Sequence, residues 1–591
     1  MKQDLRRKAR LVALGDKTWV PLDTVYSGVA SLRSLRIVTF LAELNGLTIT
    51  GGDVGNAYLE AYTKEKVCFR AGREFGELEG HLFIIDKALC GLRTSGARFH
   101  AKFADTLRQL GFKPTYADPD VWYRDAGDCY EYVVVYVDDI MTALKNPKEF
   151  YDKLSKAPFK YKLKNVEEPT YHLGGDFFRD ADGTYAYGAQ TYAKRLIETY
   201  KLLFGELPQE QHSPLAKEDH PELDDSPLLG PDGVQKYQSL MGAVQWMVTL
   251  CRFDIAQAVM SLGRFRAAPR EGHLERLKRL VGYIRKRPEC AIRFRTEIPD
   301  YESMFPEQVR YDWMESVYGC PPEEIDPRAP EPKGKKVRTT SYADANLLHD
   351  LVTGRSASGI LELLNNTPVD WFSKRQQQVE TATYGSEFMV ARQATERLID
   401  LRYTLRSFGV PLDGPAWMFG DNKSVVTSLT IPHSSLGKRW NALSYHKVRE
   451  AIAGGWLRFE HIPGIQNPAD ILTKCMPWYK AKVFVEPLLL WKGDTALAPV
   501  AAAVTAGSEG SDASPTHAVP RDSAVTSVTA DGWITVGDGF RPTTQVVNAN
   551  STIGDAGAHA GVTTSDVLYN NQYSALMAID GDETPLRGEG S

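Results

Sequence analysis

The sequence predicts a multidomain protein of the α+β and α/β classes. Residues 1 to about 150 alternate short β-like runs with helical ones, which is the pattern of a domain that mixes sheet and helix. Residues 160–295 are largely helical after a strand pair near YHLGGDFFRDADGTYAYG, and a second α/β pattern runs from TTSYADA to LLLWKGD. A chain of 591 residues has room for several domains, each with its own core.

Local signals set the elements of the first region. SGVASLRSLRIVTFLAELNG predicts a helix that ends at Gly46, and LTITGGDVGNAYLE predicts a strand, a glycine-bearing turn and the start of a helix. ARFHAKFADTLRQLGF has helical spacing and ends at Gly111. YEYVVVYVDDIMTAL, residues 130–144, is rich in Tyr and Val and predicts a buried strand that is interrupted by Asp138 and Asp139.

Composition narrows the class of protein. Charged residues make up 25% and hydrophobic ones 43%, as in soluble globular chains. No apolar run approaches the length of a membrane span, and the basic N-terminus lacks the apolar segment of a secretory signal. Seven scattered cysteines without a C-x-x-C pair indicate reduced thiols in an intracellular protein and argue against a zinc module.

The net charge of −5 is unevenly distributed. Residues 496–591 carry −8 and are rich in Ala, Gly, Ser, Thr and Asp, which predicts a disordered acidic tail. The remaining body is +3 overall, which is compatible with an anionic partner.

The adjacent acids of residues 130–144 need an explanation, because a buried carboxylate without a partner is costly. One reading is an ordinary hairpin turn whose Asp residues face water. The other begins from Asp53, which ends a β-like run 85 residues before Asp138. Strand-end carboxylates that meet at one sheet edge can hold two divalent cations, and Mg²⁺ suits ligation by oxygen alone.

Short motifs in a fixed order support the second reading. KARLVALG (8–15), GGDVGNAYLEA (51–61), ALCGLRTSGARFH (88–100), ADPDVWY (117–123) and YVVVYVDDI (132–140) are followed by YHLGGDF (171–177), YQSLMGAVQWM (237–247) and RFDIAQAV (252–259). In order, they resemble the Pol region of copia-type LTR retrotransposons, which comprises reverse transcriptase and RNase H. The resemblance covers roughly residues 8–495.

The resemblance implies a domain order. It places partial fingers and the palm of a right-hand polymerase at 1–158, a helical thumb or connection at 159–296, and a linker rich in Pro and acids at 297–337. An RNase H-like α/β domain follows at 338–495, and the tail occupies 496–591. Protease and integrase, which lie upstream in such polyproteins, do not fit in this sequence, and part of the fingers is expected to be absent.

The resemblance also implies roles in the polymerase site. Asp53 and Asp138 would be the main ligands of two Mg²⁺ or Mn²⁺ ions, supported by Asp139. Tyr58 would exclude a 2′-hydroxyl, although a tyrosine at a helix start is equally typical of a core. The expected nucleotide contacts are a backbone group of Val54 and the cations Lys8, Arg10 and Arg93. GLRTSG replaces the GLKQAP of many relatives, so the contact made by their Gln is in doubt at Thr94.

For the nuclease, the implied ligands of a second pair of Mg²⁺ or Mn²⁺ ions are Asp344, Glu387, Asp421 and Asp470. Each of these acids taken alone is typical of a surface. YGSEF stands where relatives often have TEAEY, so Glu387 is the candidate on the helix and Glu380 its weaker rival. The flexible histidine of some retroviral nucleases is not found before Asp470, where Gly464 occurs, so product release would depend on another group.

Two basic segments have two readings each. Residues 274–295 carry eight Lys or Arg, and residues 437–450 contain Lys438, Arg439, His446, Lys447 and Arg449. Either segment could contact a phosphate backbone, and either could be a solvated helix face.

The expected partners are an RNA template, a DNA primer, an RNA–DNA hybrid and deoxynucleoside triphosphates, with a tRNA primer and other retrotransposon proteins, and no membrane. The expected location is the cytoplasm, in virus-like particles if the element is active, or the nucleus. Two alternatives remain: a truncated or domesticated remnant that binds nucleic acid without copying it, and a nuclease with an idle polymerase half.

Overall fold

The computed structural model describes residues 11–306, 311–431 and 441–489. They belong to one compact unit, Met1–Asp512. Three predicted features lie outside the described residues: the cations Lys8 and Arg10, the basic residues Lys438 and Arg439, and the acidic tail.

A six-stranded antiparallel sheet forms the first α/β region, in the order β4-β5-β6-β7-β1-β8. The predicted strand pair of residues 130–144 lies at its centre because its side chains are apolar on both faces. The strands are β1 (Thr48–Val54), β4 (Lys113–Pro114), β5 (Val121–Asp125), β6 (Tyr130–Tyr136), β7 (Asp139–Leu144) and β8 (Leu163–Glu167).

Helices cover both faces of this sheet. On one face, α3 (Ser95–Gln109) and α4 (Pro147–Ser155) bury their apolar side chains against β6 and β7. On the other face lies α1 (Leu32–Asn45), the helix that was predicted to end at Gly46. Gly46 adopts a left-handed φ of 69°, a conformation that favours glycine and stops the helix.

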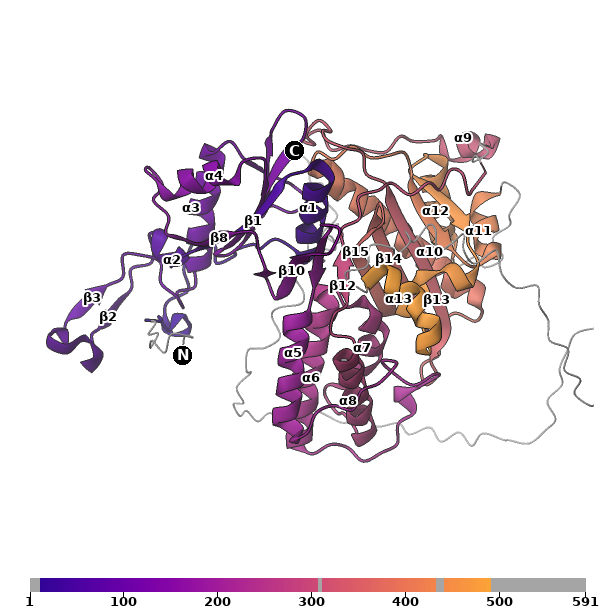
Figure 1. Cartoon of the computed structure of the whole chain (residues 1–591), viewed down its shortest axis with the longest axis horizontal. Helices are drawn as coiled ribbons and strands as arrows, with labels where there is room; N and C mark the ends of the chain where they lie inside the picture. Colours follow the sequence, from indigo (N-terminus) through magenta and orange to yellow (C-terminus); the bar gives the residue numbers. More distant parts are fainter. Residues whose placement is uncertain (1–10, 307–310, 432–440, 490–591) are drawn as a thin grey trace, which may run out of the picture. The chain divides into compact units, whose positions relative to one another are not determined.

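Two shorter elements extend this region. The four-residue helix α2 (Ala57–Glu60) follows β1, as the sequence predicts. The strands β2 (Cys68–Arg70) and β3 (Leu82–Ile84) pair as a separate hairpin, which extends away from α2 and α3 in Figure 1.

The next region begins and ends in one sheet, of order β12-β11-β10-β9. Its strands are β9 (Tyr171–His172), β10 (Gly175–Arg179), β11 (Tyr185–Gly188) and β12 (Ala291–Arg293). Between β11 and β12 run four helices, which gather below the sheet in Figure 1: α5 (Gln190–Phe204), α6 (Pro231–Leu250), α7 (Ala256–Leu262) and α8 (Glu271–Lys286). This is the largely helical segment that the sequence predicts.

The second α/β region is a five-stranded sheet of order β15-β14-β13-β16-β17. The first three strands are antiparallel, and β16 and β17 run parallel to β13 and to each other. This mixed sheet matches the predicted RNase H-like α/β domain. The strands are β13 (Thr339–Asp350), β14 (Arg355–Leu364), β15 (Thr367–Arg375), β16 (Ala416–Gly420) and β17 (Leu457–His461).

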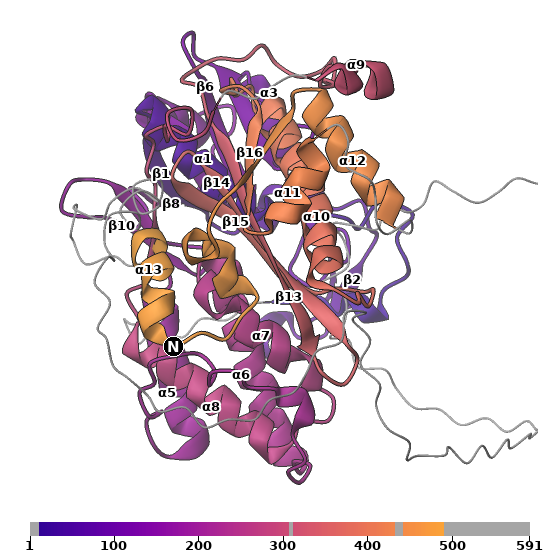
Figure 2. The same cartoon turned by 90° about the vertical axis from the view of Figure 1, so that its right-hand side faces the viewer.

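Helices α10 (Thr383–Ser407), α11 (Lys423–Thr430) and α12 (Ala442–Ala453) pack over one face of this sheet (Figure 2). A 3-10 helix, η8 (Pro468–Leu472), and α13 (Trp478–Leu489) follow β17. The other face joins the core of the preceding regions, so a single apolar cluster contains Phe40 of α1, Leu250 of α6 and Leu361 of β14.

The range 297–337, predicted as a linker from its Pro and acidic residues, packs into the second region. Tyr301 lies 5.1 Å from the Trp417 ring, and α9 (Asp312–Tyr318) buries Trp313 and Met314. The aromatic side chains spaced between the prolines account for this packing, because each covers a part of the sheet or of α12. The segment connects the two regions and is also part of the core.

Within the described residues, no helix combines the length and the apolar character that a membrane span requires.

Candidate active sites

The three acids predicted for the polymerase site lie at one end of the central strands of the first sheet. Asp53 is at the end of β1 and Asp139 at the start of β7, and the two residues are directly opposite each other in the antiparallel register. Asp138 is exposed in the turn between β6 and β7. The backbone N–H of Val54 donates to the Asp138 carbonyl at 2.8 Å, which ties the turn to β1.

The turn that carries Asp138 has an unusual backbone. Tyr136 pairs with Asp139, so Val137 and Asp138 alone connect the strands. Val137 has a φ of 58°, a region that costs a β-branched residue about 1–3 kcal/mol. The hydrogen bond from Val54 to the Asp138 carbonyl holds this turn beside the end of β1.

Charge accumulates at this strand end. Burial, and then repulsion from Asp138 and Asp53, raises the pKa of Asp139 to about 6. Carboxylates gathered at one strand end are the oxygen ligands that a hard divalent cation takes. The ligand atoms of these three acids do not all lie within 4.8 Å of one another in this structure, so their fit to the predicted metal rests on residue type and on their shared strand end.

Two of the predicted nucleotide contacts, Val54 and Tyr58, lie beside this strand end. Tyr58 is half-buried on α2, and its pKa is raised by burial and by the charge of Asp138. The N–H of Val54 is committed to the Asp138 carbonyl, so it is not available to a ligand. Arg93 is exposed, but its guanidinium donates to the carbonyls of Gly15 at 2.6 Å and Asp16 at 3.3 Å.

The structure brings the nuclease acids together from four elements. In the parallel pair β13 and β16, Tyr342 lies opposite Phe419, so Asp344 and Asp421, each two residues further on, reach the same sheet edge. Glu387 approaches from α10. Among the described residues, Asp344, Glu387 and Asp421 are the one group of three His, Cys, Asp or Glu side chains whose ligand atoms all lie within 4.8 Å of one another.

Glu380, the rival of Glu387, is buried before the start of α10 and is outside this group. The geometry therefore favours Glu387 as the helix ligand.

Burial and mutual repulsion make ionisation of this cluster unfavourable. Burial, and then the charges of Asp344 and Asp421, raises the pKa of Glu387 to about 9. Burial and Asp344 likewise raise the pKa of Asp421 and of Asp470. Acids that resist ionisation beside one another would be stabilised by a divalent cation, so these residues also fit the predicted metal.

Asp470 joins the cluster through a residue that the sequence reasoning did not single out. The ammonium of Lys474 donates to Asp470 Oδ1 at 2.7 Å and to Asp344 Oδ1 at 3.1 Å. The hydroxyl of Thr473 donates to the other oxygen of Asp344. Both residues belong to the NPADILTK motif, and the four-residue spacing between Asp470 and Lys474 was a signal that could have revealed the pair.

A histidine that the sequence reasoning did not single out also lies beside this site. His461 ends β17 opposite Gly420, and its Nε2 is 3.1 Å from the backbone oxygen of Asp421. The local motif around Gly464 does not reveal His461, because the neighbouring strand β16 brings this histidine to Asp421.

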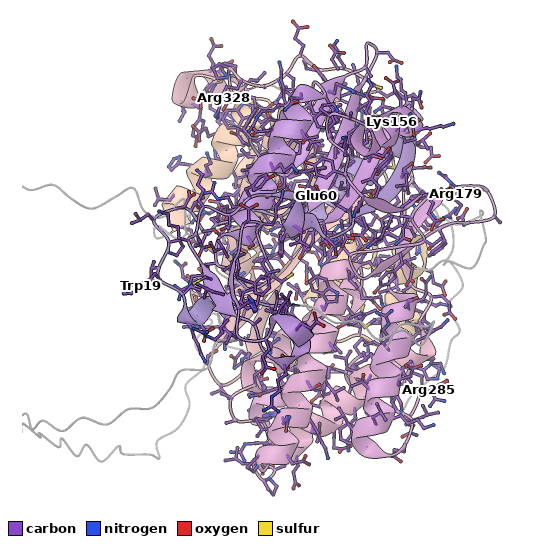
Figure 3. The ribbon with its side chains drawn as sticks, turned by 90° about the vertical axis from the view of Figure 1, so that its left-hand side faces the viewer. Trp19, Glu60, Lys156, Arg179, Arg285 and Arg328 are labelled. Atoms are coloured by element: carbon purple, nitrogen blue, oxygen red, sulfur yellow. The ribbon has the colours of Figure 1, made fainter. Side chains whose placement is uncertain are left out.

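The basic segment of residues 274–295 forms most of α8 and the strand β12 rather than one helix, and several of its cations have partners within the protein. Arg276 bonds Asp219 at 2.9 Å and also pairs with Asp224. Arg285, labelled in Figure 3, donates to the Pro208 carbonyl at 2.6 Å. These contacts favour a structural role over the phosphate-binding alternative.

The described part of the second basic segment behaves in the same way. Arg449 is 4% exposed, donates to the carbonyls of Ser428 and Ile431, and lies 3.6 Å from the centre of the Trp313 ring. It is therefore not available to grip a nucleic-acid backbone. His446 bonds the Tyr318 hydroxyl at 2.7 Å.

Parts of the chain are similar to known proteins. Residues 1–206 match the family described as reverse transcriptase (RNA-dependent DNA polymerase). The chain is 24% identical over 474 residues to the retrovirus-related Pol polyprotein from transposon RE1 of Arabidopsis thaliana, covering 79% of this chain and 29% of that protein. It is 23% identical over 495 residues to the one from transposon TNT 1-94 of Nicotiana tabacum, covering 82% and 34%.

These matches confirm the predicted similarity to a retrotransposon Pol region. The chain spans about three-tenths of the length of the RE1 polyprotein.

Among solved structures, the foamy viral protease-reverse transcriptase dRH in complex with ds DNA aligns with a TM-score of 0.40 and 13% identity, over 75% of this chain and 60% of that one. LC11-RNase H1 in complex with RNA/DNA hybrid aligns with a TM-score of 0.19 and 16% identity, over 23% and 94%.

Proposed function

We propose that this chain is a retrotransposon reverse transcriptase with RNase H activity. It would synthesise DNA on RNA and DNA templates and cleave the RNA strand of RNA–DNA hybrids. The observation that carries the proposal is the presence of two separate acid clusters in one chain, one in a region that matches reverse transcriptases and one on an RNase H-like sheet.

In the polymerase half, Asp53, Asp138 and Asp139 would hold two Mg²⁺ or Mn²⁺ ions, with the Val54 carbonyl beside them. Bound cations of this kind lower the pKa of an attacking hydroxyl and neutralise charge on the leaving phosphate. The strained turn at Val137 positions Asp138, and Tyr58 would lie under the sugar of the incoming nucleotide. Arg93, held by two backbone carbonyls, would contact the nucleotide triphosphate.

In the nuclease half, Asp344, Glu387, Asp421 and Asp470 would ligate the cations. Their raised pKa values reflect a negative charge that bound cations would offset. A 2′-hydroxyl on the cut strand would let the site tell RNA from DNA. Both activities serve one process, because copying RNA leaves a hybrid whose RNA must be removed before second-strand synthesis.

The proposed partners are an RNA template, a DNA primer, the hybrid product and deoxynucleoside triphosphates, together with a tRNA primer and other retrotransposon proteins. The proposed location is the cytoplasm, in virus-like particles of an active element, or the nucleus.

The test is a pair of assays on the full chain: primer extension on RNA and DNA templates, and cleavage of a hybrid labelled in its RNA strand. Glu387→Gln should abolish cleavage and leave extension intact, while Glu396→Gln, at an exposed position on the same helix, should change neither. Extension without cleavage by the wild type would make the second half a structural remnant. Cleavage without extension would leave a nuclease with an idle polymerase half.

A further inference from the structure

Lys474 is the cation that the nuclease cluster already contains. Its ammonium lies between two of the four predicted metal ligands, 3.1 Å from Asp344 Oδ1 and 2.7 Å from Asp470 Oδ1. Asp344 is fully buried, and its second oxygen accepts the hydroxyl of Thr473. Both oxygens of Asp344 are therefore engaged by consecutive residues of the chain.

The four acids are divided into two groups by this arrangement. Asp344, Glu387 and Asp421 bring their ligand atoms within 4.8 Å of one another, as one directly bound ion requires. Asp470 stands outside that trio, and Lys474 bridges it to Asp344. A cation shared by Asp344 and Asp470 would have to take the place of the ammonium.

We propose that Lys474 is a positioning residue of the nuclease site and acts as its built-in counter-ion. One divalent cation binds Asp344, Glu387 and Asp421 directly while Lys474 stays in place. A second cation binds Asp344 and Asp470 only after it has displaced the Lys474 ammonium. The inference rests on the proposed nuclease function. It makes the two cation sites unequal, since only the second competes with a positive charge of the protein. The second cation would therefore bind only when hybrid phosphates help to recruit it or when its concentration is high.

The side chain is able to move. Lys474 is 37% exposed, whereas the carboxylate of Asp344 beside it is fully buried. The ammonium can therefore swing toward solvent while its backbone stays in place after η8, where Lys474 N–H donates to the Asp470 carbonyl at 3.0 Å.

The test counts Mn²⁺ ions bound by the full chain, with the polymerase acids changed to Asn (Asp53, Asp138 and Asp139) so that the nuclease site alone is measured. Free Mn²⁺ is followed by electron paramagnetic resonance. We expect one tight ion and a second that binds at least about tenfold more weakly. Lys474→Met should tighten the second ion about tenfold or more, because the competing charge is gone.

Three further variants separate the explanations. Lys474→Arg, which keeps the charge, should retain the weak second site. Lys480→Met, an exposed lysine on α13, should bind as the parent does. Asp344→Asn should lose both ions. If Mn²⁺ binding survives Asp344→Asn, the ions are elsewhere and the proposed nuclease site itself is wrong. If the parent binds two equal ions and Lys474→Met changes nothing, the nuclease site stands and the role of Lys474 is refuted.

A measurement on the unaltered chain does not depend on how the variants fold. Displacement by the second cation should expose the Lys474 ammonium to an acetylating reagent. Acetylation of Lys474, quantified by peptide mass spectrometry, should rise at least about threefold at saturating Mn²⁺, as expected for an amine released from an ion pair. Lys480 acetylation should stay constant. A fall in Lys474 acetylation with Mn²⁺ would overturn the proposal.

Discussion

Asp53 and Asp139 lie directly opposite each other on the antiparallel strands β1 and β7. Like charges in such a pair destabilise a sheet. The pKa of Asp139 is raised first by burial and then by repulsion from Asp138 and Asp53. This unfavourable pair lies at the end of the central strands of the sheet, where Asp138 adds a third acid. Three neighbouring carboxylates do not stabilise the fold, whereas a cation site requires such a group of negative ligands.

The first prediction concerns Asp138. Asp138→Asn should lower primer extension on the order of 100-fold or more, because a lost cation ligand raises the barrier and each tenfold corresponds to about 1.4 kcal/mol. Hybrid cleavage should be unaffected. The matched control is Asp128→Asn, an exposed acid just before β6 that pairs with Lys145. Extension by the Asp138 variant at the wild-type rate would remove this residue from the site.

The second prediction concerns the choice of sugar. Tyr58 is half-buried at the start of α2, and it is close enough to Asp138 that the charge of this acid contributes to the raised pKa of Tyr58. Tyr58→Ala opens space there and should raise ribonucleotide incorporation about tenfold or more relative to deoxyribonucleotides. Tyr62→Ala serves as the control, since Tyr62 is 64% exposed and its ring faces Lys87. Unchanged selectivity in single-nucleotide extension would make Tyr58 a core residue only.

The third prediction concerns Gly52, next to Asp53. A Cβ at Gly52 would lie 2.8 Å from Cε1 of the buried Tyr151, whose hydroxyl donates to the Thr50 carbonyl. Gly52→Ala should therefore lower the free energy of unfolding by about 1–3 kcal/mol and reduce extension by displacing β1.

Gly242 provides the comparison, because a Cβ on this residue of α6 meets nothing within 4 Å. Gly242→Ala should be neutral or stabilise by up to about 1 kcal/mol. Urea unfolding of both variants checks the pair, and equal effects would mean that the contact with Tyr151 does not constrain the strand.

Much of this fold could be predicted from the sequence because its signals are local. The apolar run around Asp138 and Asp139 predicts the β6–β7 hairpin, and the glycine after a periodic segment predicts the end of α1 at Gly46. Fold class and the similarity to a Pol region followed from such stretches.

The rest depends on contacts between distant segments. Lys474 reaches Asp344 because η8 packs against β13 and β14, and His461 reaches Asp421 because β16 and β17 are neighbours in the sheet. Trp313 is buried although its surroundings are rich in Pro and acids. The role of the basic residues of α8 could not be decided from the sequence for the same reason, because their acidic partners are distant in the chain. Arg276, for example, bonds Asp219, which is 57 residues away.

The last prediction concerns stability and pH in metal-free buffer. A glutamate in the unfolded chain ionises near pH 4.3, whereas Glu387 in the folded chain, buried beside Asp344 and Asp421, holds its proton to about pH 9. Between these values the folded state binds more protons than the unfolded state, so the stability of the protein falls as pH rises. Below pH 4 both states are protonated and the penalty vanishes.

Glu387→Gln removes this titration. At pH 8 the variant should be more stable than the wild type by at least about 1 kcal/mol, since one unit of pKa shift corresponds to about 1.4 kcal/mol. At pH 4 the two should be nearly equal. Glu396→Gln, on the exposed face of α10 where Glu396 pairs with Arg392 at 2.8 Å, should follow the wild type at both pH values.

Saturating Mn²⁺ should reverse the order of stability at pH 8, because a ligand that binds only the folded state stabilises it and the wild type keeps the carboxylate that binds the ion. Thermal unfolding at both pH values, with and without Mn²⁺, provides the measurement. A Gln variant that is less stable than the wild type at pH 8 without metal would show that Glu387 is a stabilising structural acid rather than a strained cation ligand.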